Sequence, residues 1–113
     1  MTIPEINAMV ESMGLPFEYY EFPEGTSQEP PYIVWFLSRD DDFKADNENY
    51  CDIEQLNIEL YTSTKDFELE NQVEAVLKAN GFTYYKESNK IDSEKLWQIS
   101  FEMEVVINES EEE

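Results

Sequence analysis

The residues of this chain that could do chemistry are carboxylates, and they are densest in one short polar segment. That cluster consists of Asp40, Asp41, Asp42, Asp46, Asn47 and Glu48. Hard oxygen ligands of this kind suit Ca²⁺ or Mg²⁺, but the EF-hand spacing, with its central glycine and terminal glutamate, is absent. A solvated acidic loop is the simpler interpretation, and a weak cation site is the alternative.

Other catalytic arrangements lack their key residues. The chain has no histidine, one cysteine and three glycines. This composition excludes Ser-His-Asp and Cys-His catalysis, a histidine zinc site and a glycine-rich phosphate loop. Paired carboxylates could support glycoside hydrolysis, but among 27 acidic residues such pairs arise by chance. We therefore expect no enzyme, no cofactor and no resident metal.

The charge balance is the most unusual feature of the composition. Seven basic and 27 acidic residues among 113 give a formal net charge of −20. Lysine and arginine are needed to displace the counterions of a phosphate backbone, so sequence-specific nucleic-acid binding is not expected. Docking on an anionic membrane is not expected for the same reason. The charge fits either a basic partner surface or a role in which repelling DNA is useful.

The ends of the chain and its cysteine suggest where the protein is made. The first residues contain Glu5 and Glu11 but neither a basic cluster nor a long apolar run, so no signal peptide or membrane span is predicted. Cys51 has no disulfide partner and is expected to be a small apolar residue in a reducing compartment. We expect synthesis in a bacterial cytoplasm.

The elements that would position these residues follow from periodicity. Apolar residues at helical spacing predict one helix over residues 4–14 and a second that is capped by Ser63 or Thr64 and ends at Gly81. Strands are predicted over residues 17–22, 32–38, 56–62, 82–88 and 96–106. The unbroken apolar run of residues 32–38 indicates a strand covered on both faces.

Two of these strands alternate clearly between apolar and polar side chains. Leu56, Ile58 and Leu60 fall on one face, whereas Glu59 and Tyr61 fall on the other. In residues 96–106 the polar side includes Glu102 and Glu104. Such alternation is typical of an antiparallel sheet with one covered and one polar face. We expect one α+β domain over residues 1–106, with a mainly antiparallel sheet and two helices packed on one face.

Two segments are expected to lie outside that packed structure. An acidic loop is predicted at about residues 39–50, and a disordered acidic tail at residues 107–113. Aromatic residues at strand spacing, from Tyr19 to Phe36, are expected to be core rather than a recognition platform. One of Tyr84 and Tyr85 must face outward, and outward tyrosines suggest a partner contact.

Several phrases of the sequence resemble a known family. They are "PYIVWF", "IELYTSTKDFELENQVEAVLKANGF" and "IDSEKLWQISFEMEV". From about Ile6 to Val106 the chain resembles the small tail-completion proteins (tail terminator, head–tail joining) of long-tailed phages and prophages of Gram-positive bacteria. Lys65 and Asp66 match the strand-to-helix turn of that family, and their simplest role is helix capping.

The resemblance implies a structural virion protein. Its subunits would form a hexameric ring on the tail tube, stop tube polymerisation and meet the head connector, so its partners would be other copies, the tube protein and connector proteins. DNA would pass through the ring without being held, and we hypothesise that the excess of acidic residues forms its inner wall. The candidate contact residues are Asp40, Asp41, Asp42, Asp46, Glu59, Tyr61, Glu102 and Glu104.

Two other interpretations of the sequence stay open. A very acidic small protein can mimic DNA, with carboxylates in place of phosphates, and so inhibit a DNA-binding host protein. The acids of this chain, however, are concentrated in a loop, a helix start and a tail rather than in one stripe. A host module that binds a metal or a small molecule would depend on Asp40, Asp41 and Asp42 alone.

Overall fold

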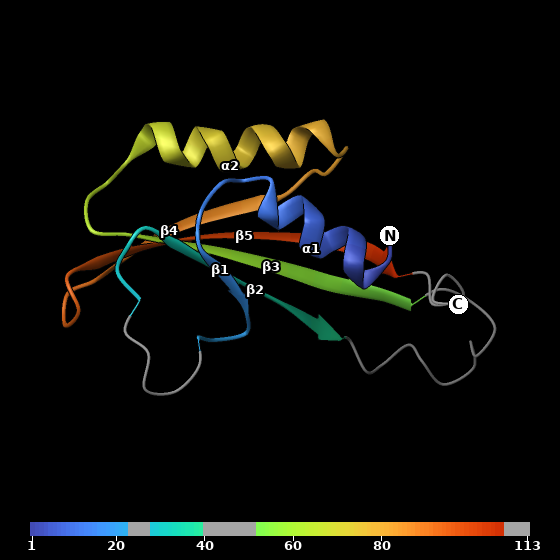
Figure 1. The fold of residues 1–113 in the computed structure, drawn as a ribbon, viewed down its shortest axis with the longest axis horizontal. Coiled ribbons are helices and arrows are strands. Elements are labelled where there is room, and N and C mark those ends of the chain that lie inside the picture. The colour runs from blue at the N-terminus through green and yellow to red at the C-terminus, as the bar shows by residue number, and fades with distance from the viewer. Residues whose placement is uncertain (23–27, 40–51, 108–113) are drawn as a thin grey trace.

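The computed structural model describes residues 1–22, 28–39 and 52–107, which form two helices and one five-stranded sheet (Figure 1). The elements in chain order are α1 (Ile3–Glu11), β1 (Phe17–Tyr19), β2 (Tyr32–Arg39), β3 (Asp52–Thr62), α2 (Phe67–Ala79), β4 (Tyr85–Ile91) and β5 (Leu96–Ile107). The strand order in the sheet is β1-β2-β3-β5-β4. The acidic loop residues 40–50 and residues 108–113 lie outside the described part.

Helix α1 begins and ends with well-defined caps. The backbone N–H of Glu5 donates to the Thr2 hydroxyl, and the Glu5 carboxylate accepts from the Thr2 backbone N–H, which together form a capping box. Pro4 lies in the first turn, where its missing N–H costs nothing. The helix ends before Gly14, whose φ of +87° suits a residue without a Cβ.

Helix α2 begins later than the sequence suggested. The expectation that Ser63 or Thr64 caps it is wrong, because the helix starts at Phe67 and Asp66 is the residue that precedes its first turn. The Asp66 side chain accepts a 3.1 Å hydrogen bond from the backbone N–H of Leu69. The role of Asp66 as a cap is thereby confirmed.

The sheet is antiparallel except at one edge. Strands β3 and β5 pair along their whole length, from Asp52 opposite Ile107 to Thr62 opposite Trp97. Strand β1 pairs with β2 in parallel and stops at Tyr19, three residues earlier than predicted, because Tyr20 has a φ of +73°. The predicted α+β class, with a mainly antiparallel sheet and two helices, is confirmed.

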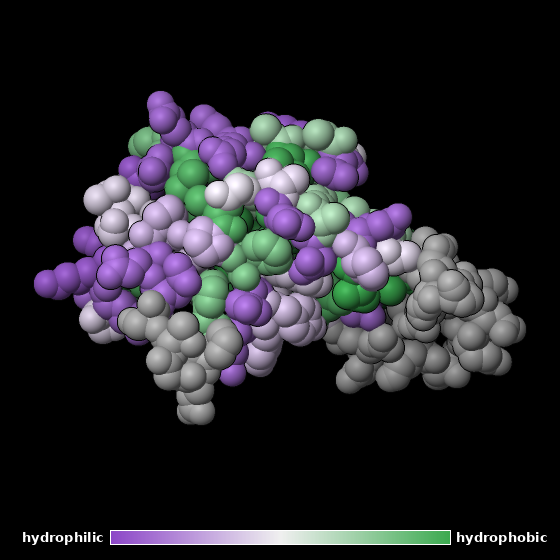
Figure 2. All heavy atoms as spheres, in the orientation of Figure 1, coloured by the Kyte–Doolittle hydropathy of each residue, from purple (hydrophilic) through white to green (hydrophobic). Residues whose placement is uncertain are grey.

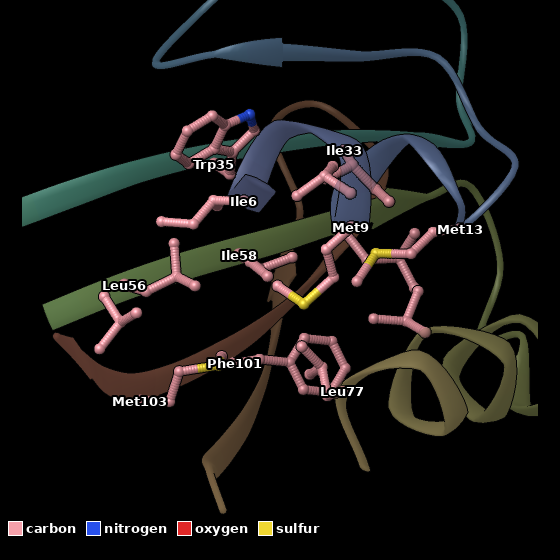
Figure 3. Packing of buried hydrophobic residues seen from close by; sticks show 14 of the residues in the cluster. Ile6, Met9, Met13, Ile33, Trp35, Leu56, Ile58, Leu77, Phe101 and Met103 are labelled. Carbon is pink, nitrogen blue, oxygen red and sulfur yellow. The ribbon is translucent and has the colours of Figure 1, made fainter. Parts of the chain in front are cut away.

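The core lies between the helices and one face of the sheet. Side chains of α1 and α2, including Ile6, Met9 and Leu77, join Ile58 and Phe101 in a single buried cluster (Figure 3). Both helices therefore cover the same face, as predicted. The prediction that β2 is covered on both faces holds in part: no described helix packs on its second face, yet Val34 there is buried and the Tyr20 ring lies against Phe36.

The expected boundaries differ slightly from the structure at the end of β5. This strand extends to Ile107, which is buried, whereas the domain was expected to end at residue 106. The Met1 amino group donates a 2.8 Å hydrogen bond to the carbonyl oxygen of Val106, so the start of the chain is fastened to the end of this strand. In the described residues we find no helix that is both long and apolar enough to span a membrane.

Candidate functional site

The sheet has one face without a described helix, which we call the open face. Val34, Glu59, Ser100 and Glu87 are paired in register across the sheet and lie on this face. Because side chains alternate along a strand, every second residue from each of them lies on the same face. Its polar and aromatic members are Glu18, Tyr32, Phe36, Ser38, Gln55, Asn57, Glu59, Tyr61, Tyr85, Glu87, Asn89, Gln98, Ser100, Glu102 and Glu104. Most of these side chains are polar and uncharged.

The structure brings half of the predicted contact residues onto this face. Glu59 and Tyr61 project from β3, and Glu102 and Glu104 project from the neighbouring β5. Their placement agrees with the alternation in the sequence, while their role as contacts stays a prediction. The other four, Asp40, Asp41, Asp42 and Asp46, lie outside the described residues.

Tyr61 is the centre of a small polar network on the open face. Its hydroxyl donates a 2.9 Å hydrogen bond to Glu59 and accepts one of 2.9 Å from the Gln98 amide. Its ring stacks on Tyr32, with 5.0 Å between the ring centroids. Burial, together with the bond to Glu59 and against the opposing effect of Gln98, raises the pKa of Tyr61 to about 12. The tyrosine is thus held rigid and protonated.

A second network on the open face was not anticipated from the sequence. The Asn57 amide nitrogen donates a 3.0 Å hydrogen bond to the Ser38 hydroxyl, and its oxygen accepts a 3.0 Å bond from Gln55. Asn57 is buried, so these bonds satisfy groups that would otherwise be costly to remove from water. Its position between Leu56 and Ile58 marks it as part of the polar side of β3, but its partner Ser38 comes from the neighbouring strand β2.

The charges of the chain are sorted between the two sides of the sheet. Among the described residues the open face carries five glutamates, which are Glu18, Glu59, Glu87, Glu102 and Glu104, and its sheet positions include no lysine. Lys86 and Lys90 of β4 point to the helix side, where they lie over Phe101 and Trp97. The open face is therefore a polar and acidic surface.

The helix side contains a buried carboxylate that the sequence did not reveal. Glu70 lies in the first turn of α2, yet its side chain is 1% exposed and pairs with Lys65 and Lys86. Lys86 also bonds to Glu74, and the Tyr84 hydroxyl donates to Glu74 at 2.6 Å. The i, i+4 spacing of the two glutamates places them on one face of the helix, but it does not show that β4 lies beside that face.

The aromatic residues divide between the core and the edge of the sheet. Trp35 is buried, which agrees with the expectation, whereas Tyr19 and Tyr20 are exposed beside β1 and contradict it. The cause is the short β1, since Tyr20 leaves the sheet and its ring meets Phe36 edge-on at 5.8 Å. Of the tyrosine pair in β4 and the preceding turn, Tyr85 faces outward and Tyr84 packs on Phe101.

A cluster of metal ligands or a groove could carry further chemistry. Within residues 1–22, 28–39 and 52–107 no three His, Cys, Asp or Glu side chains are grouped so that they could hold a metal ion. A groove of about 590 Å³ lies beside the end of β5, lined by Met1, residues 80–83 and residues 104–106. It borders the part of β5 that extends beyond its pairing with β4, which stops at Glu102.

The fold is similar to that of a virion component. A chain in the structure described as "Virion of native gene transfer agent (GTA) particle" superposes with a TM-score of 0.56, covering 88% of this chain and 83% of that chain. The sequences are 12% identical, so the likeness shows a shared fold. The sequence matches no family model and no curated protein.

Proposed function

We propose that this protein is a structural virion component of a tailed phage or prophage, and that it forms the ring that completes the tail. The observation that carries the proposal is the fold shared with a gene transfer agent virion chain over 88% of the present chain. The resemblance of the sequence to tail-completion proteins supports the specific role. In that role a hexameric ring stops polymerisation of the tail tube and meets the head connector.

The open face suits the inner wall of such a ring. DNA that passes through a ring must not be held, and a wall of hydroxyl, amide and carboxylate groups without lysine gives phosphates nothing to bind. Glu59, Glu102 and Glu104 would repel the DNA backbone, while the hydrogen bonds of Tyr61 and Asn57 keep the surface rigid. The ring subunit has no reaction to catalyse, so the protein is proposed not to be an enzyme.

The decisive experiment is electron microscopy of lysates from the parent phage or prophage with this gene silenced. We expect abnormally long tails beside filled heads that lack tails, because nothing would stop the tube or join it to the head. Supplying the intact gene in trans should restore normal virions. Virions of normal length and assembly in the silenced strain would overturn the proposal.

A second candidate function uses the same face. Five glutamates without lysine on the open face would also fit an acidic mimic of DNA that occupies a DNA-binding host protein. Competition with duplex DNA for a restriction enzyme distinguishes the two roles. A mimic would release the enzyme from DNA at stoichiometric concentration, whereas a ring subunit would not.

A further inference from the structure

We infer that copies of this chain join head to tail, with the β4 edge of one copy against the β1 edge of the next. The inference rests on the proposed ring and names the surfaces that build it. We define the lysine edge as Lys78, Lys86, Lys90 and Lys95 together with Tyr85. We define the glutamate edge as Glu18 and Glu21 together with Tyr19 and Tyr20.

The two edges lie at opposite ends of one sheet. In the strand order β1-β2-β3-β5-β4, the first and last strands each have one side without a described neighbour. A contact between two different surfaces on opposite sides of a subunit is heterologous, and it closes into a ring when the rotation per copy permits. A contact of an edge with its own copy would instead give only a dimer.

Charge decides which surface another copy can approach. At −20, two copies repel each other over most of their surface. Residues 1–22 and 28–38, which form α1, β1 and most of β2, contain five glutamates and no lysine or arginine. Residues 65–95 contain five of the seven basic residues of the chain beside seven acidic ones. Every lysine of the described residues lies in this segment, so the lysine edge is the described surface that can offer cations to the glutamate edge.

The lysines of β4 are presented at fixed positions. Lys86 is held by Glu70 and Glu74 of α2, which fastens the strand to the helix. Lys90 is 56% exposed, and its Nζ is 3.8 Å from Asp92, at the outer limit of an ion pair. Hydrophilic side chains gather where the β4–β5 turn lies, at the left end of the molecule in Figure 2. Lys90 thus retains a charge that a glutamate of a neighbouring copy could meet.

Exposed tyrosines on both edges point to the same contact. Tyr85 is 65% exposed on the lysine edge, and Tyr19 and Tyr20 are 50% and 65% exposed on the glutamate edge. Tyrosine is enriched in protein interfaces because it offers a large apolar ring with a polar tip. Tyr20 keeps a φ of +73°, which is unfavourable for a residue with a Cβ, while its backbone N–H bonds to Trp35 at 2.8 Å. Such retained strain is characteristic of functional surfaces.

The first test is crosslinking of copies assembled in virions, in a Cys51→Ser background. Glu18→Cys and Asn89→Cys are made singly and together, and the particles are treated with a short bismaleimide. Head-to-tail contact predicts a ladder of covalent oligomers for the double variant and monomers for each single variant. Dimers from either single variant, or no ladder from a double variant that is present in virions and restores tail length, would overturn the inference while the terminator role stands.

Charge reversal provides the second test. Lys90→Glu should lower the titre of complemented phage by at least about tenfold, since like charges across an interface are strongly unfavourable. Glu21→Lys, at the glutamate edge, should recover part of that loss in the double variant. Lys90→Gln is the matched control, expected to have a smaller effect than reversal.

An edge lysine can also serve only to prevent aggregation of an open strand. In that case Lys90→Glu would keep the full titre, and the inference would be wrong. If tails of the silenced strain have normal length, the proposed function fails first and the ring contact fails with it.

Discussion

The Glu70 carboxylate lies 2.9 Å from the ammonium group of Lys86, which joins the first half of α2 to the edge strand β4 across the sheet. The glutamate is 1% exposed, whereas the side chains of its two lysine partners are 26% and 34% exposed. A buried carboxylate needs such partners, because an unpaired charge in the interior is strongly destabilising. The contact therefore sets the position of the edge strand relative to the helix.

Removing Lys86 should destabilise the protein. Lys86→Met leaves Glu70 buried with Lys65 as its remaining described partner, and we expect a loss of about 2 kcal/mol in the free energy of unfolding. Urea denaturation at neutral pH measures the change. Lys78→Met on the exposed surface of α2 is the matched control, and should change stability by less than about 0.5 kcal/mol. Equal effects of the two variants would show that the buried pair contributes nothing.

Tyr61 and Tyr84 should lose their hydroxyl protons at a higher pH in the folded protein than in the unfolded chain. Burial and the neighbouring Glu59 and Glu74 together raise the pKa of Tyr61 and of Tyr84 to about 12. In the unfolded chain tyrosine loses its proton near pH 10. Between these values the folded state holds more protons, so stability is complete below about pH 10 and falls as pH rises toward about 12.

Ultraviolet absorbance of tyrosinate provides the measurement. The native protein should show a late-titrating component that Tyr61→Phe and Tyr84→Phe each reduce by about half, while the chain in guanidinium titrates in one step. A native titration that coincides with the denatured one would contradict the prediction. So would a late component that both variants leave unchanged.

The glycine after α2 should be required for its backbone angle rather than for space. Gly81 has a φ of +82°, and a Cβ added there would meet no atom within 4 Å. Gly81→Ala should therefore cost about 1 kcal/mol through backbone strain alone. Gly81→Asn should cost less, because asparagine tolerates this conformation better. Thermal unfolding of the two variants tests the order, and an alanine variant as stable as the native protein would refute it.

Reversing charge on the open face should change its behaviour toward DNA without unfolding it. Glu102→Lys with Glu104→Lys places two cations on the proposed inner wall. We expect normal tails but slower DNA ejection, and salt-sensitive binding of duplex DNA by the purified protein. Glu11→Lys with Glu68→Lys, on exposed parts of the helices, is the control with the same net charge. If the two double variants eject DNA at the same rate, the open face does not line the inner wall of the ring.

Local periodicity in the sequence was sufficient to place the faces of β3 and β5. Leu56 and Ile58 alternate with Asn57 and Glu59, and this period of two holds whatever lies on either side. The outward direction of Glu102 and Glu104 follows from the same period of two, and the apolar stripe of α1 follows from the helical spacing of its residues. These are properties of residues adjacent in the chain.

Contacts between distant segments were decided only by the tertiary structure. Glu70 looks like an exposed acid at a helix start until β4 brings Lys86 beside it, and Asn57 looks exposed until Ser38 bonds to it. The parallel pairing of β1 and the insertion of β5 between β3 and β4 likewise depend on long-range packing. Periodicity states which side of a strand is buried, but it carries no information about which partner a charge or an edge will meet.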